Sequence, residues 1–550
     1  MTLREQVEAW IADDPDPASR AELRALLDGG AEPELAERFA GGLRFGTAGL
    51  RGRVEAGPAR MNRATVRKAS AGLAAFVRDA GGGSVIVGHD ARRGSPEFAA
   101  EAAAVLSGAG LTTYRLPARA PTPLLAFAVR HLACAAGVMI TASHNPPRDN
   151  GFKVYLGEGA PLAPPDDAAV AAAIEAVGPL PAVPLGDGGE TLGEEVADAY
   201  LAAIVAALPA SAARTVRIAY TPLHGVGGRF CLAALERAGF PAPTVVAAQA
   251  EPDPDFPTVA RPNPEEPGTL DLVLEEAARS GADLMLANDP DADRLAVGIP
   301  QDGGWRVLHG DETGALLADF LLELTPDPAH ALLASTVASS SLTARLAEAA
   351  GARFVETLVG FKWLMRAPAQ APEHRLLLAY EEALGYAVSD VVRDKDGISA
   401  ALVVAQLAAA ELAAGRTLAD RLDAIAARFG VHATAPLTVE LEGADGTARR
   451  RAIMAALRAD PPSALIGRPI RAVDDLQTGV RRRPDGGEEA PLSLPRDDVL
   501  VLRGDGVRVV VRPSGTEPKL KSYLEVVAAD RGEAAAALAA LKSELGARLR

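Results

Sequence analysis

Ser143 lies in a polar hexapeptide, Thr141-Ala142-Ser143-His144-Asn145-Pro146, directly after the apolar run 135–140. Such a run is typical of a strand covered on both faces, and the asparagine and prolines that follow end any regular element. A hydroxyl on this turn, beside an imidazole, can accept and donate a group such as phosphoryl. Ser143 is therefore a candidate nucleophile, with an ordinary turn as the alternative.

Three aspartates, Asp289, Asp291 and Asp293, alternate directly after a second apolar run at 282–287. On a curved segment all three carboxylates can turn inward, and oxygen ligands at this density suit Mg²⁺. The glycine and distal glutamate of a calcium-binding EF-hand loop are absent. Arg294 comes next and can offset carboxylate charge or contact phosphate. A solvated acidic turn is the alternative.

Two further strand-like runs end in distinctive loops. Glu381-Glu382-Ala383-Leu384-Gly385 offers two carboxylates and no base, which fits hydrogen bonding to sugar hydroxyls; a helix N-terminus would explain it equally well. The loop after 507–511 supplies Arg512, two hydroxyls, a glycine amide and Lys519, a group suited to a phosphate dianion or to a plain polar turn. Near the N-terminus, the glycine-rich loop 45–52 can approach an anion closely, with a surface turn as the alternative.

The elements around these loops follow an alternating order. Helices are expected within 1–40 and at 63–80, 95–108 and 194–208, strands at 84–90 and before Ser143, and a loop at 157–193. Strand, helix, strand at this spacing indicates a parallel α/β arrangement. A turn at 150–151 would return the chain as a strand and bring Lys153 near the serine. The glycines at 225–228 favour tight packing over phosphate binding.

Ligands of open parallel sheets gather beyond the carboxyl ends of the strands. Four strand-end loops, one in each of four proposed units, therefore predict a single cleft lined by all four. The units are predicted to span 1–208, 209–322, 323–438 and 439–550.

Composition limits the function classes. A formal charge of −16 over 550 residues argues against binding to nucleic acid or to an anionic membrane, so the cations for a phosphate substrate must be gathered locally. Two cysteines, Cys134 and Cys231, provide neither a disulfide framework nor a cysteine-rich metal site. The N-terminus lacks the apolar segment of a signal peptide, and no stretch is long enough to span a bilayer. We expect a cytoplasmic protein; the sequence leaves its oligomeric state open.

The four loops, in this order, resemble the motifs of the α-D-phosphohexomutases, the phosphoglucomutase and phosphomannomutase family. Agreement extends to the loop 45–52, Asn150-Gly151-Phe152-Lys153 and Arg393-Asp394-Lys395-Asp396-Gly397. The Glu-Glu-Ala-Leu-Gly form of the third loop points to the branch that contains phosphoglucomutase-2-like and phosphopentomutase enzymes.

The resemblance implies a four-domain α/β architecture, with three related α/β domains and a smaller C-terminal α+β domain around a central cleft. The domains would carry, in order, the phosphoserine, the metal, the sugar-recognition residues and the phosphate-binding loop. Ser143 would carry the phosphoryl group, and Mg²⁺ would be held by its phosphate with Asp289, Asp291 and Asp293. A sugar 1,6-bisphosphate would be the intermediate and activator.

The resemblance also implies roles for individual residues. Arg51, Lys153 and Arg294 would be the cations near the transfer, and His144 or Lys153 would move the proton. Glu381 would read sugar hydroxyls, and Lys395 would assist at the substrate. The full substrate-binding set is Arg294, Gly360, Lys362, Glu381, Glu382, Lys395, Arg512, Ser514, Gly515 and Thr516.

The expected activity is interconversion of glucose 1-phosphate and glucose 6-phosphate. Phosphomannomutase or phosphopentomutase activity is the near alternative, because Ala383 and Val359 stand where many hexomutases carry hydroxyl side chains. Two other classes stay open: a sugar-bisphosphate synthase that takes phosphoryl from an outside donor, and a non-catalytic regulator that binds sugar phosphates. Retention of the serine and all three aspartates disfavours the regulator.

Overall fold

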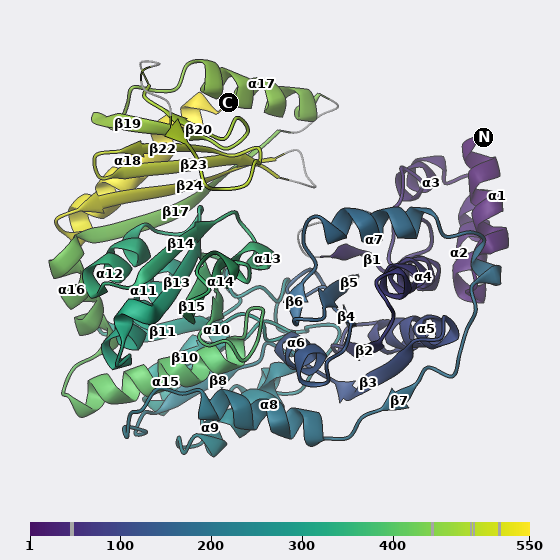
Figure 1. Cartoon of the computed structure of the whole chain (residues 1–550), viewed down its shortest axis with the longest axis horizontal. Helices are drawn as coiled ribbons and strands as arrows, with labels where there is room; N and C mark the ends of the chain where they lie inside the picture. The colour runs from purple at the N-terminus through teal and green to yellow at the C-terminus, as the bar shows by residue number, and fades with distance from the viewer. Residues whose placement is uncertain (44–48, 442–444, 485–486, 488–489, 515–518, 550) are drawn as a thin grey trace. The chain divides into compact units, whose positions relative to one another are not determined.

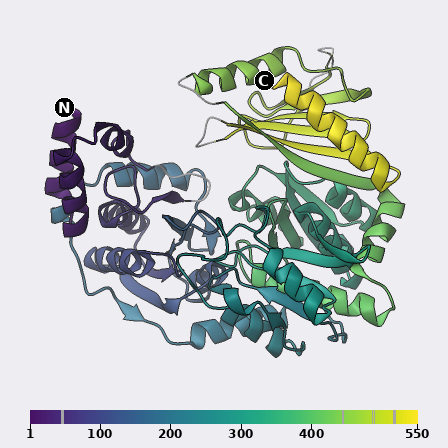
Figure 2. The ribbon, with the colours of Figure 1, turned by 180° about the vertical axis from the view of Figure 1, so that it is seen from behind.

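The computed structural model describes residues 1–43, 49–441, 445–484, 487, 490–514 and 519–549. Contacts divide the chain into two compact units, residues 1–308 with 383–415, and residues 309–382 with 416–550. Each unit contains β-sheet covered by helices, and the C-terminal part of the chain forms an antiparallel sheet (Figure 1; Figure 2 gives the reverse view).

Three helices begin the first unit: α1 (Leu3–Asp13), α2 (Pro17–Asp28) and α3 (Glu32–Arg38). Thr2 and Glu5 form a capping box at the start of α1, and Asp16 caps α2 ahead of Pro17, so both starts have the chemistry that helix N-termini favour. Val7, Ile11, Leu23, Leu35 and Ala56 form the buried core that joins the helices to the next segment. The helical expectation for 1–40 is confirmed.

The first sheet has the order β1-β5-β4-β2-β3-β7. Strand β2 pairs in parallel with β3 and β4, whereas β5 returns antiparallel to β4 and places Lys153 opposite Met139. The strands are β1 (Leu50–Arg53), β2 (Ser84–His89), β3 (Thr112–Arg119), β4 (Ala136–Ile140), β5 (Asp149–Leu156), β6 (Ala160–Pro161), which pairs with β5, and β7 (Glu190–Thr191). The predicted return of Lys153 toward the serine loop is confirmed.

Helices cover this sheet on both faces. On one face, α4 (Arg63–Asp79) and α5 (Ser95–Gly108) pack on Val85, Val87 and Val138. On the other, α6 (Thr122–His131) places Leu125 and Val129 against Gly88 and Gly137, and it also contacts α8 (Glu195–Ala206). The short apolar runs are therefore strands buried on both faces, as predicted.

One expectation is wrong in this region. Residues 157–193 were expected to be a loop, but they contain α7 (Asp166–Glu175), which packs on α4 with Val170 fully buried. The helix is alanine-rich, and Asp166 and Asp167 suit its N-terminus. Prolines on either side of this helix give the segment the composition of a loop.

The second sheet has the order β12-β11-β10-β8-β9. Its parallel strands are β8 (Ile218–Thr221), β9 (Thr244–Val245) and β10 (Leu284–Ala287); β11 (Ala296–Gln301) and β12 (Gly304–Val307) continue antiparallel. The helices that accompany it are α9 (Gly227–Arg237), α10 (Asp271–Ser280) and α15 (Gly397–Ala413), with a 3-10 turn at Ala247–Gln249. The first unit also contains the strand β16 (Gly385–Ala387), which is not part of this sheet, and a 3-10 turn at Leu180–Ala182 between α7 and α8.

The glycines after β8 serve packing. A Cβ on Gly225 would lie 2.4 Å from the Cα and the carbonyl oxygen of Pro290, and one on Gly227 would lie 2.7 Å from the Cβ of Ala292. Such distances are too short for a side chain, so only glycine lets the 225–227 segment approach the loop after β10. The structure agrees with the prediction that these glycines allow tight packing.

The second unit holds another α/β layer, with β13 (Ala331–Thr336) parallel to both β14 (Arg353–Thr357) and β15 (Arg375–Glu381). Its helices are α11 (Gly310–Leu324), α12 (Leu342–Ala350), α13 (Phe361–Leu364), α14 (Ala367–Gln370) and α16 (Leu418–Phe429), with a 3-10 turn at Pro328–His330. Gly314 of α11 packs on the Tyr380 ring, where a Cβ would lie 2.6 Å from a ring carbon.

The C-terminal part is an antiparallel sheet with the order β17-β24-β23-β22-β19-β20-β21. The strands are β17 (Val431–Glu440), β18 (Ala464–Leu465), β19 (Arg468–Asp475), β20 (Val480–Arg482), β21 (Ala490–Pro491), β22 (Leu500–Gly504), β23 (Val507–Pro513) and β24 (Lys519–Ala528). Helices α17 (Gly446–Ala459) and α18 (Arg531–Arg548) bury Met454, Leu541 and Leu545 in its core. The predicted class, α/β layers followed by a smaller α+β part, is confirmed.

Within the described residues, no single helix is long and apolar enough to cross a membrane. Helices α15 and α16 reach the length and composition of a span only when counted together as a bent pair. Most residues of α15 are buried inside the first unit.

Gly225 provides a test of the close packing. We expect Gly225→Ala to destabilise the protein by about 1–3 kcal/mol, because the new methyl group must displace the backbone of Pro290. Gly178→Ala is the matched control, since a Cβ there meets nothing within 4 Å. The measurement is the thermal unfolding midpoint of both variants by circular dichroism. Equal midpoints would show that the two loops do not need the glycine.

Candidate active site

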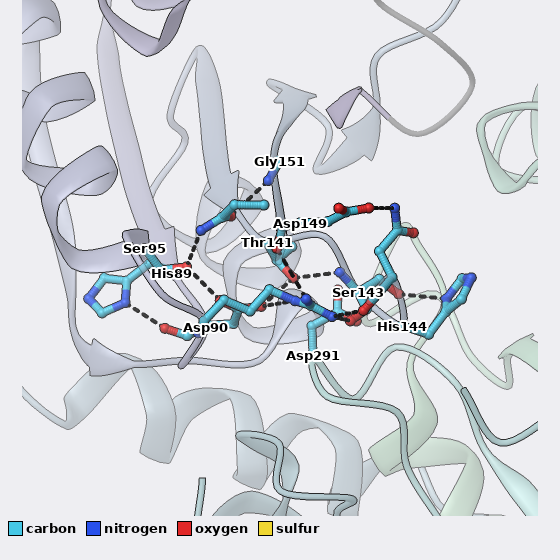
Figure 3. Close-up of polar contacts among 12 residues, drawn as sticks. His89, Asp90, Ser95, Thr141, Ser143, His144, Asp149, Gly151 and Asp291 are labelled. Carbon is cyan, nitrogen blue, oxygen red and sulfur yellow. Dashed lines mark hydrogen bonds and ion pairs between the residues drawn. The ribbon is translucent and has the colours of Figure 1, made fainter. Parts of the chain in front are cut away.

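Ser143 occupies a tightly held turn directly after β4. Its φ of 54° is in the left-handed region, which is unfavourable for a residue with a side chain. The backbone amide donates to Thr141 Oγ1 at 2.8 Å, and the Oγ lies 3.1 Å from His144 Nδ1 (Figure 3). The Oγ also lies 2.8 Å from Asp289 Oδ2. The hydroxyl thus has a carboxylate and an imidazole within hydrogen-bond reach.

The three predicted aspartates converge. Asp289, Asp291 and Asp293 each offer one carboxylate oxygen, all within 4.8 Å of one another, and all three side chains are buried. Asp291 Oδ1 and Asp293 Oδ1 are buried atoms with no hydrogen-bond partner in the structure. Buried carboxylate oxygens left in this state fit a hard divalent cation. The cluster therefore fits a metal site.

Two lysines from distant parts of the chain contact this cluster. Lys153 on β5 places its Nζ 2.7 Å from Asp291 Oδ2 and 2.9 Å from Asp293 Oδ2. Lys395 Nζ lies 3.3 Å from Asp293 Oδ2 and 3.3 Å from Asp394 Oδ1. Both ammonium groups offset the carboxylate charge in a buried setting, where unpaired charges are strongly unfavourable.

Two arginines complete the cationic surroundings. The backbone amide of Arg294 donates to Asp289 Oδ1 at 3.0 Å, and its side chain reaches Glu265 at 3.3 Å. Arg51 on β1 donates to Asn145 Oδ1 at 3.0 Å, two residues beyond Ser143. Burial lowers the pKa of the Arg51 guanidinium, against the raising effect of Asp291 and Asp293.

The carboxylates respond differently to this environment. Burial, with repulsion from Asp291 and Asp293, raises the pKa of Asp289 well above its usual range. Burial also acts to raise the pKa of Asp291, but Lys153 outweighs it and the pKa lies below the usual range. For Asp293, burial and the neighbouring Asp291 are likewise outweighed by the lysines, and its pKa is lowered.

His144 and Lys153 are held in opposite protonation states. Burial, followed by the nearby charges of Arg294 and Arg51, lowers the pKa of the His144 imidazole well below its usual range. Burial works against the charge on Lys153, but Asp291 and Asp293 raise its pKa. Near neutral pH the imidazole is therefore uncharged and the lysine is protonated.

Lys395 is placed by two buried tyrosines. Tyr155 donates to Asp394 Oδ2 at 2.7 Å, and Tyr200 donates to Asp396 Oδ1 at 2.9 Å. The Asp396 carboxylate also accepts from the amides of residues 398 and 399 and thereby caps α15. The lysine is thus held between two anchored aspartates.

The first unit therefore brings together nine of the predicted site residues. They are Arg51, Ser143, His144, Lys153, Asp289, Asp291, Asp293, Arg294 and Lys395.

Glu381 and Glu382 lie in the second unit, at the end of β15 and just beyond it. Glu382 Oε2 accepts from the hydroxyls of Thr336 and Ser339 at 3.2 Å each. Burial, together with Glu381 and Asp311, raises the pKa of Glu382 to about 7. The segment continues through a turn into β16, so its interpretation as a helix N-terminus is wrong.

The other predicted residues of the second unit lie on two elements. Gly360, with a φ of 114°, lies directly before α13, and Lys362 on that helix is buried with its Nζ 5.9 Å from the centre of the Trp363 ring. Arg512 lies on β23, and the buried Ser514 follows it, its amide donating to the carbonyl of Lys519 at 2.8 Å. Gly515 and Thr516, and residues 45–48 of the glycine-rich loop, lie outside the described residues.

Sequence reasoning missed several contributors to the site. Thr122 donates to Asp291 Oδ2 at 2.6 Å, and Asp90 accepts from Thr141 at 2.6 Å. Arg92 donates to backbone carbonyls of the serine loop. Asp90 and Arg92 follow β2 in the way that the other motifs follow their strands, so the strand-end rule could have found them. Nothing in the sequence near Thr122 indicates its partner.

Comparison with known proteins gives matches along most of the chain. Four family models of phosphoglucomutase/phosphomannomutase match in order: α/β/α domain I at residues 42–179, domain II at 198–303, domain III at 309–429 and the C-terminal domain at 469–541.

Curated relatives cover nearly the full chain. A probable phosphomannomutase of Haemophilus influenzae is 39% identical, over 87% of this chain and 96% of its own. A probable phosphoribomutase of Schizosaccharomyces pombe is 36% identical over 95% and 93%, and a phosphoglucomutase of Staphylococcus haemolyticus is 35% identical over 88% and 90%. A solved structure from Thermus thermophilus, described as a phosphomannomutase, aligns with a TM-score of 0.69 at 27% identity, over 92% of this chain and 99% of that one.

The raised pKa of Glu382 predicts a pH-dependent effect on stability. Between about pH 4.5 and 7 the unfolded chain releases this proton while the folded protein keeps it, so the folded state loses stability as pH rises. Glu382→Gln removes the ionisation. We expect the variant to be more stable than wild type at pH 8, by at most about 3 kcal/mol, and equal to it at pH 4.5.

The measurement is the thermal unfolding midpoint at both pH values. Glu373→Gln, at an exposed position in the same unit, is the control and should show no such difference. A Glu382→Gln effect of the same size at both pH values would argue for a lost contact and against the raised pKa.

Proposed function

Because the chain belongs to the phosphoglucomutase/phosphomannomutase family of sugar-phosphate mutases, we propose that it interconverts glucose 1-phosphate and glucose 6-phosphate through a phosphorylated Ser143. The single observation that carries the assignment is the position of the Ser143 hydroxyl. It lies 2.8 Å from one carboxylate of a buried three-aspartate cluster, and the Nζ atoms of Lys153 and Lys395 contact that cluster.

The phosphoryl transfer proceeds in two steps. A sugar hydroxyl bonds to the phosphorus on Ser143 as the bond between Oγ and phosphorus breaks; the hydroxyl gives up its proton and the serine oxygen regains one. The sugar 1,6-bisphosphate formed in this way reorients and returns its other phosphoryl group to Ser143. No outside phosphoryl donor is consumed, because the enzyme ends in its starting state.

Asp289, Asp291 and Asp293 would hold Mg²⁺, and the unpartnered oxygens of Asp291 and Asp293 support this choice. When bound, the ion supplies positive charge against the oxygens of the transferring group. The Asp291 carboxylate is oriented by Thr122 at 2.6 Å and by Lys153 at 2.7 Å, so the ligand set is held in place by the protein itself.

His144 and Lys153 would move the protons. The uncharged His144 Nδ1, 3.1 Å from the Ser143 oxygen, is suited to accept a proton there. Lys153 is held charged by two carboxylates and is suited to donate a hydrogen bond or proton to an oxygen that gains negative charge. Arg51 and Arg294 add fixed positive charge to the same surroundings.

The family resemblance assigns substrate recognition to a further set of residues. Glu381 and Glu382 would accept hydrogen bonds from sugar hydroxyls, and Lys395 would contact the substrate. Arg512 and Ser514, with Gly515 and Thr516, would hold the phosphate that is not being transferred, because a guanidinium and hydroxyls suit a dianion. Gly360 and Lys362 would contribute from the start of α13.

Ribose phosphate is the second candidate substrate, in line with the phosphopentomutase branch. The relative named as a phosphoribomutase covers 95% of this chain, and Val359 and Ala383 lack the hydroxyls that hexose recognition would use. Val359 packs beside an apolar cluster that includes Leu358. Mannose phosphate is supported by the relative named as a phosphomannomutase.

Replacement of the serine tests the transfer itself. Wild-type protein incubated with glucose 1,6-bisphosphate and Mg²⁺ should gain one phosphoryl group on the peptide that contains Ser143, as measured by mass spectrometry. Ser143→Ala should gain none and should lose at least about 10³-fold in kcat, because the covalent step is removed. Ser211→Ala, in an irregular segment of the same unit, should behave as wild type. Phosphorylation of another peptide in active wild type would overturn the assignment.

Sugar preference is tested by turnover of the 1-phosphates of glucose, mannose and ribose, each with Mg²⁺ and a trace of the matching bisphosphate. We expect kcat/KM for glucose 1-phosphate to exceed the other two by at least about tenfold, an energy difference of about 1.4 kcal/mol. A ribose preference, reduced by the double replacement Val359→Thr and Ala383→Ser, would establish the second candidate. Net bisphosphate formation that requires an outside phosphoryl donor would identify a bisphosphate synthase instead.

A further inference from the structure

Arg92 is a charged side chain that is only 1% exposed and lies beneath the serine loop. Its Nη1 donates to the carbonyl oxygens of Pro146 at 2.9 Å and Asp149 at 3.1 Å. Its Nη2 donates to the carbonyl oxygen of Asn145 at 2.7 Å and to that of Ser143. One guanidinium thus joins four carbonyls spread over seven residues of the loop.

This arrangement needs the shape of a guanidinium. A guanidinium presents donors in a fixed plane, so its two terminal nitrogens can serve two carbonyls each. A lysine would keep the charge but has all its donors on one nitrogen at the end of a flexible stem. The loop carbonyls would then lose their partners, which is unfavourable for buried backbone groups.

The charge of Arg92 is compensated inside the protein. Arg92 Nε lies 3.4 Å from Asp90 Oδ2, and the Phe256 ring covers the guanidinium with its centre 5.1 Å from the Arg92 Cζ. Asp90 is itself fixed, because Ser95 and the Arg92 amide donate to its Oδ1 at 2.7 and 3.0 Å. The loop after β2 is therefore a rigid base for the guanidinium.

A second contact holds the serine from its amide side. The Thr141 hydroxyl donates to Asp90 Oδ2 at 2.6 Å and accepts from the Ser143 amide at 2.8 Å, so Thr141 lies between Asp90 and Ser143 (Figure 3). The amide and the carbonyl of Ser143 are thus both fixed from the loop after β2. These contacts involve the backbone of Ser143 and leave its Oγ to Asp289 and His144.

The backbone of Ser143 needs such support. With a φ of 54° it is in a region that costs on the order of 1–3 kcal/mol, and such residues persist only where the surroundings over-determine them. We propose that Arg92, together with Thr141, is a positioning element of the phosphoryl transfer, which holds the Ser143 backbone so that its Oγ stays against the aspartate cluster. This inference rests on the proposed transfer through Ser143.

The test compares Arg92→Lys with Arg93→Lys. Arg93 is the next residue, is 62% exposed and pairs with the exposed Asp255. Its replacement by lysine keeps the charge and changes the head group and length in the same way, without altering a side chain that contacts the serine loop. A displacement of about 1 Å at a reacting atom can reduce the rate about 100-fold. We expect Arg92→Lys to lower kcat by about 10- to 100-fold with KM within about twofold of wild type, and Arg93→Lys to match wild type.

Two measurements separate positioning from damage to the fold. The final extent of Ser143 phosphorylation by glucose 1,6-bisphosphate gives the fraction of competent sites. The rate of phosphorylation measures the transfer step at those sites. A positioning role slows the rate per competent site. A purely structural role would lower the number of sites and leave the rate per site unchanged, and this result would overturn the proposal.

Thr141→Val is the second variant, because Arg92→Lys could prevent folding. It keeps the shape of the side chain and removes only the hydroxyl that links Asp90 to the Ser143 amide. The same loss in kcat with unchanged KM supports the proposal. Wild-type kcat in a folded Thr141→Val overturns it.

The wild-type reaction distinguishes failure of the proposed function from failure of the positioning role alone. If wild type takes no phosphoryl group onto Ser143, the proposed function fails and the positioning role fails with it. If wild type is phosphorylated there and both variants turn over at its rate, only the role of Arg92 and Thr141 fails.

Discussion

The repulsion among three buried carboxylates is the constraint around which the first unit is built. If all three carboxylates were ionised, each of the three pairs, which lie within 4.8 Å of one another, would repel by at least about 3 kcal/mol at an effective dielectric constant of about 20. Without compensation these carboxylates would take up protons and lose their value as metal ligands. Lys153 and Lys395, from elements far apart in the sequence, contact the cluster and keep Asp291 and Asp293 ionised.

The need to offset the repulsion among these carboxylates explains features of the fold outside the aspartate cluster. Lys153 reaches the cluster because β5 returns antiparallel to β4, and Lys395 reaches it because Tyr155 and Tyr200 anchor the aspartates on either side. Gly225 lets a neighbouring loop pack directly on Pro290 between two of the aspartates. The overall charge of −16 makes this local gathering of cations necessary, since the field of the whole protein repels a phosphorylated substrate.

The residues that could be predicted are those that directly follow a buried strand. Ser143 and the aspartates come immediately after apolar runs, and the carboxyl ends of strands are where ligands gather. Local sequence does not show which side chain from another element will contact them. Thr122 begins a helix and orients Asp291, yet nothing near it distinguishes that role from an ordinary helix start. Helix α7 was not predicted, because the prolines on both sides of its alanine-rich sequence are typical of a loop. Packing against α4, which local sequence does not show, stabilises this helix.

The two units divide the residues by task. The serine, the aspartates and the cations that contact them all belong to the first unit, whereas Val359 and Glu382 belong to the second and have contacts of their own, with an apolar cluster and with the hydroxyls of Thr336 and Ser339. Ser143 is held by Thr141, Arg92, His144 and Asp289. A change at Val359 in the second unit or at Ala383 in the first leaves these contacts in place. Relatives named for mannose, ribose and glucose phosphates are 39%, 36% and 35% identical to this chain, which is consistent with one transfer site serving several sugars. The buried charges around Ser143 are suited to the phosphoryl group, which is the part that all of these sugar phosphates share.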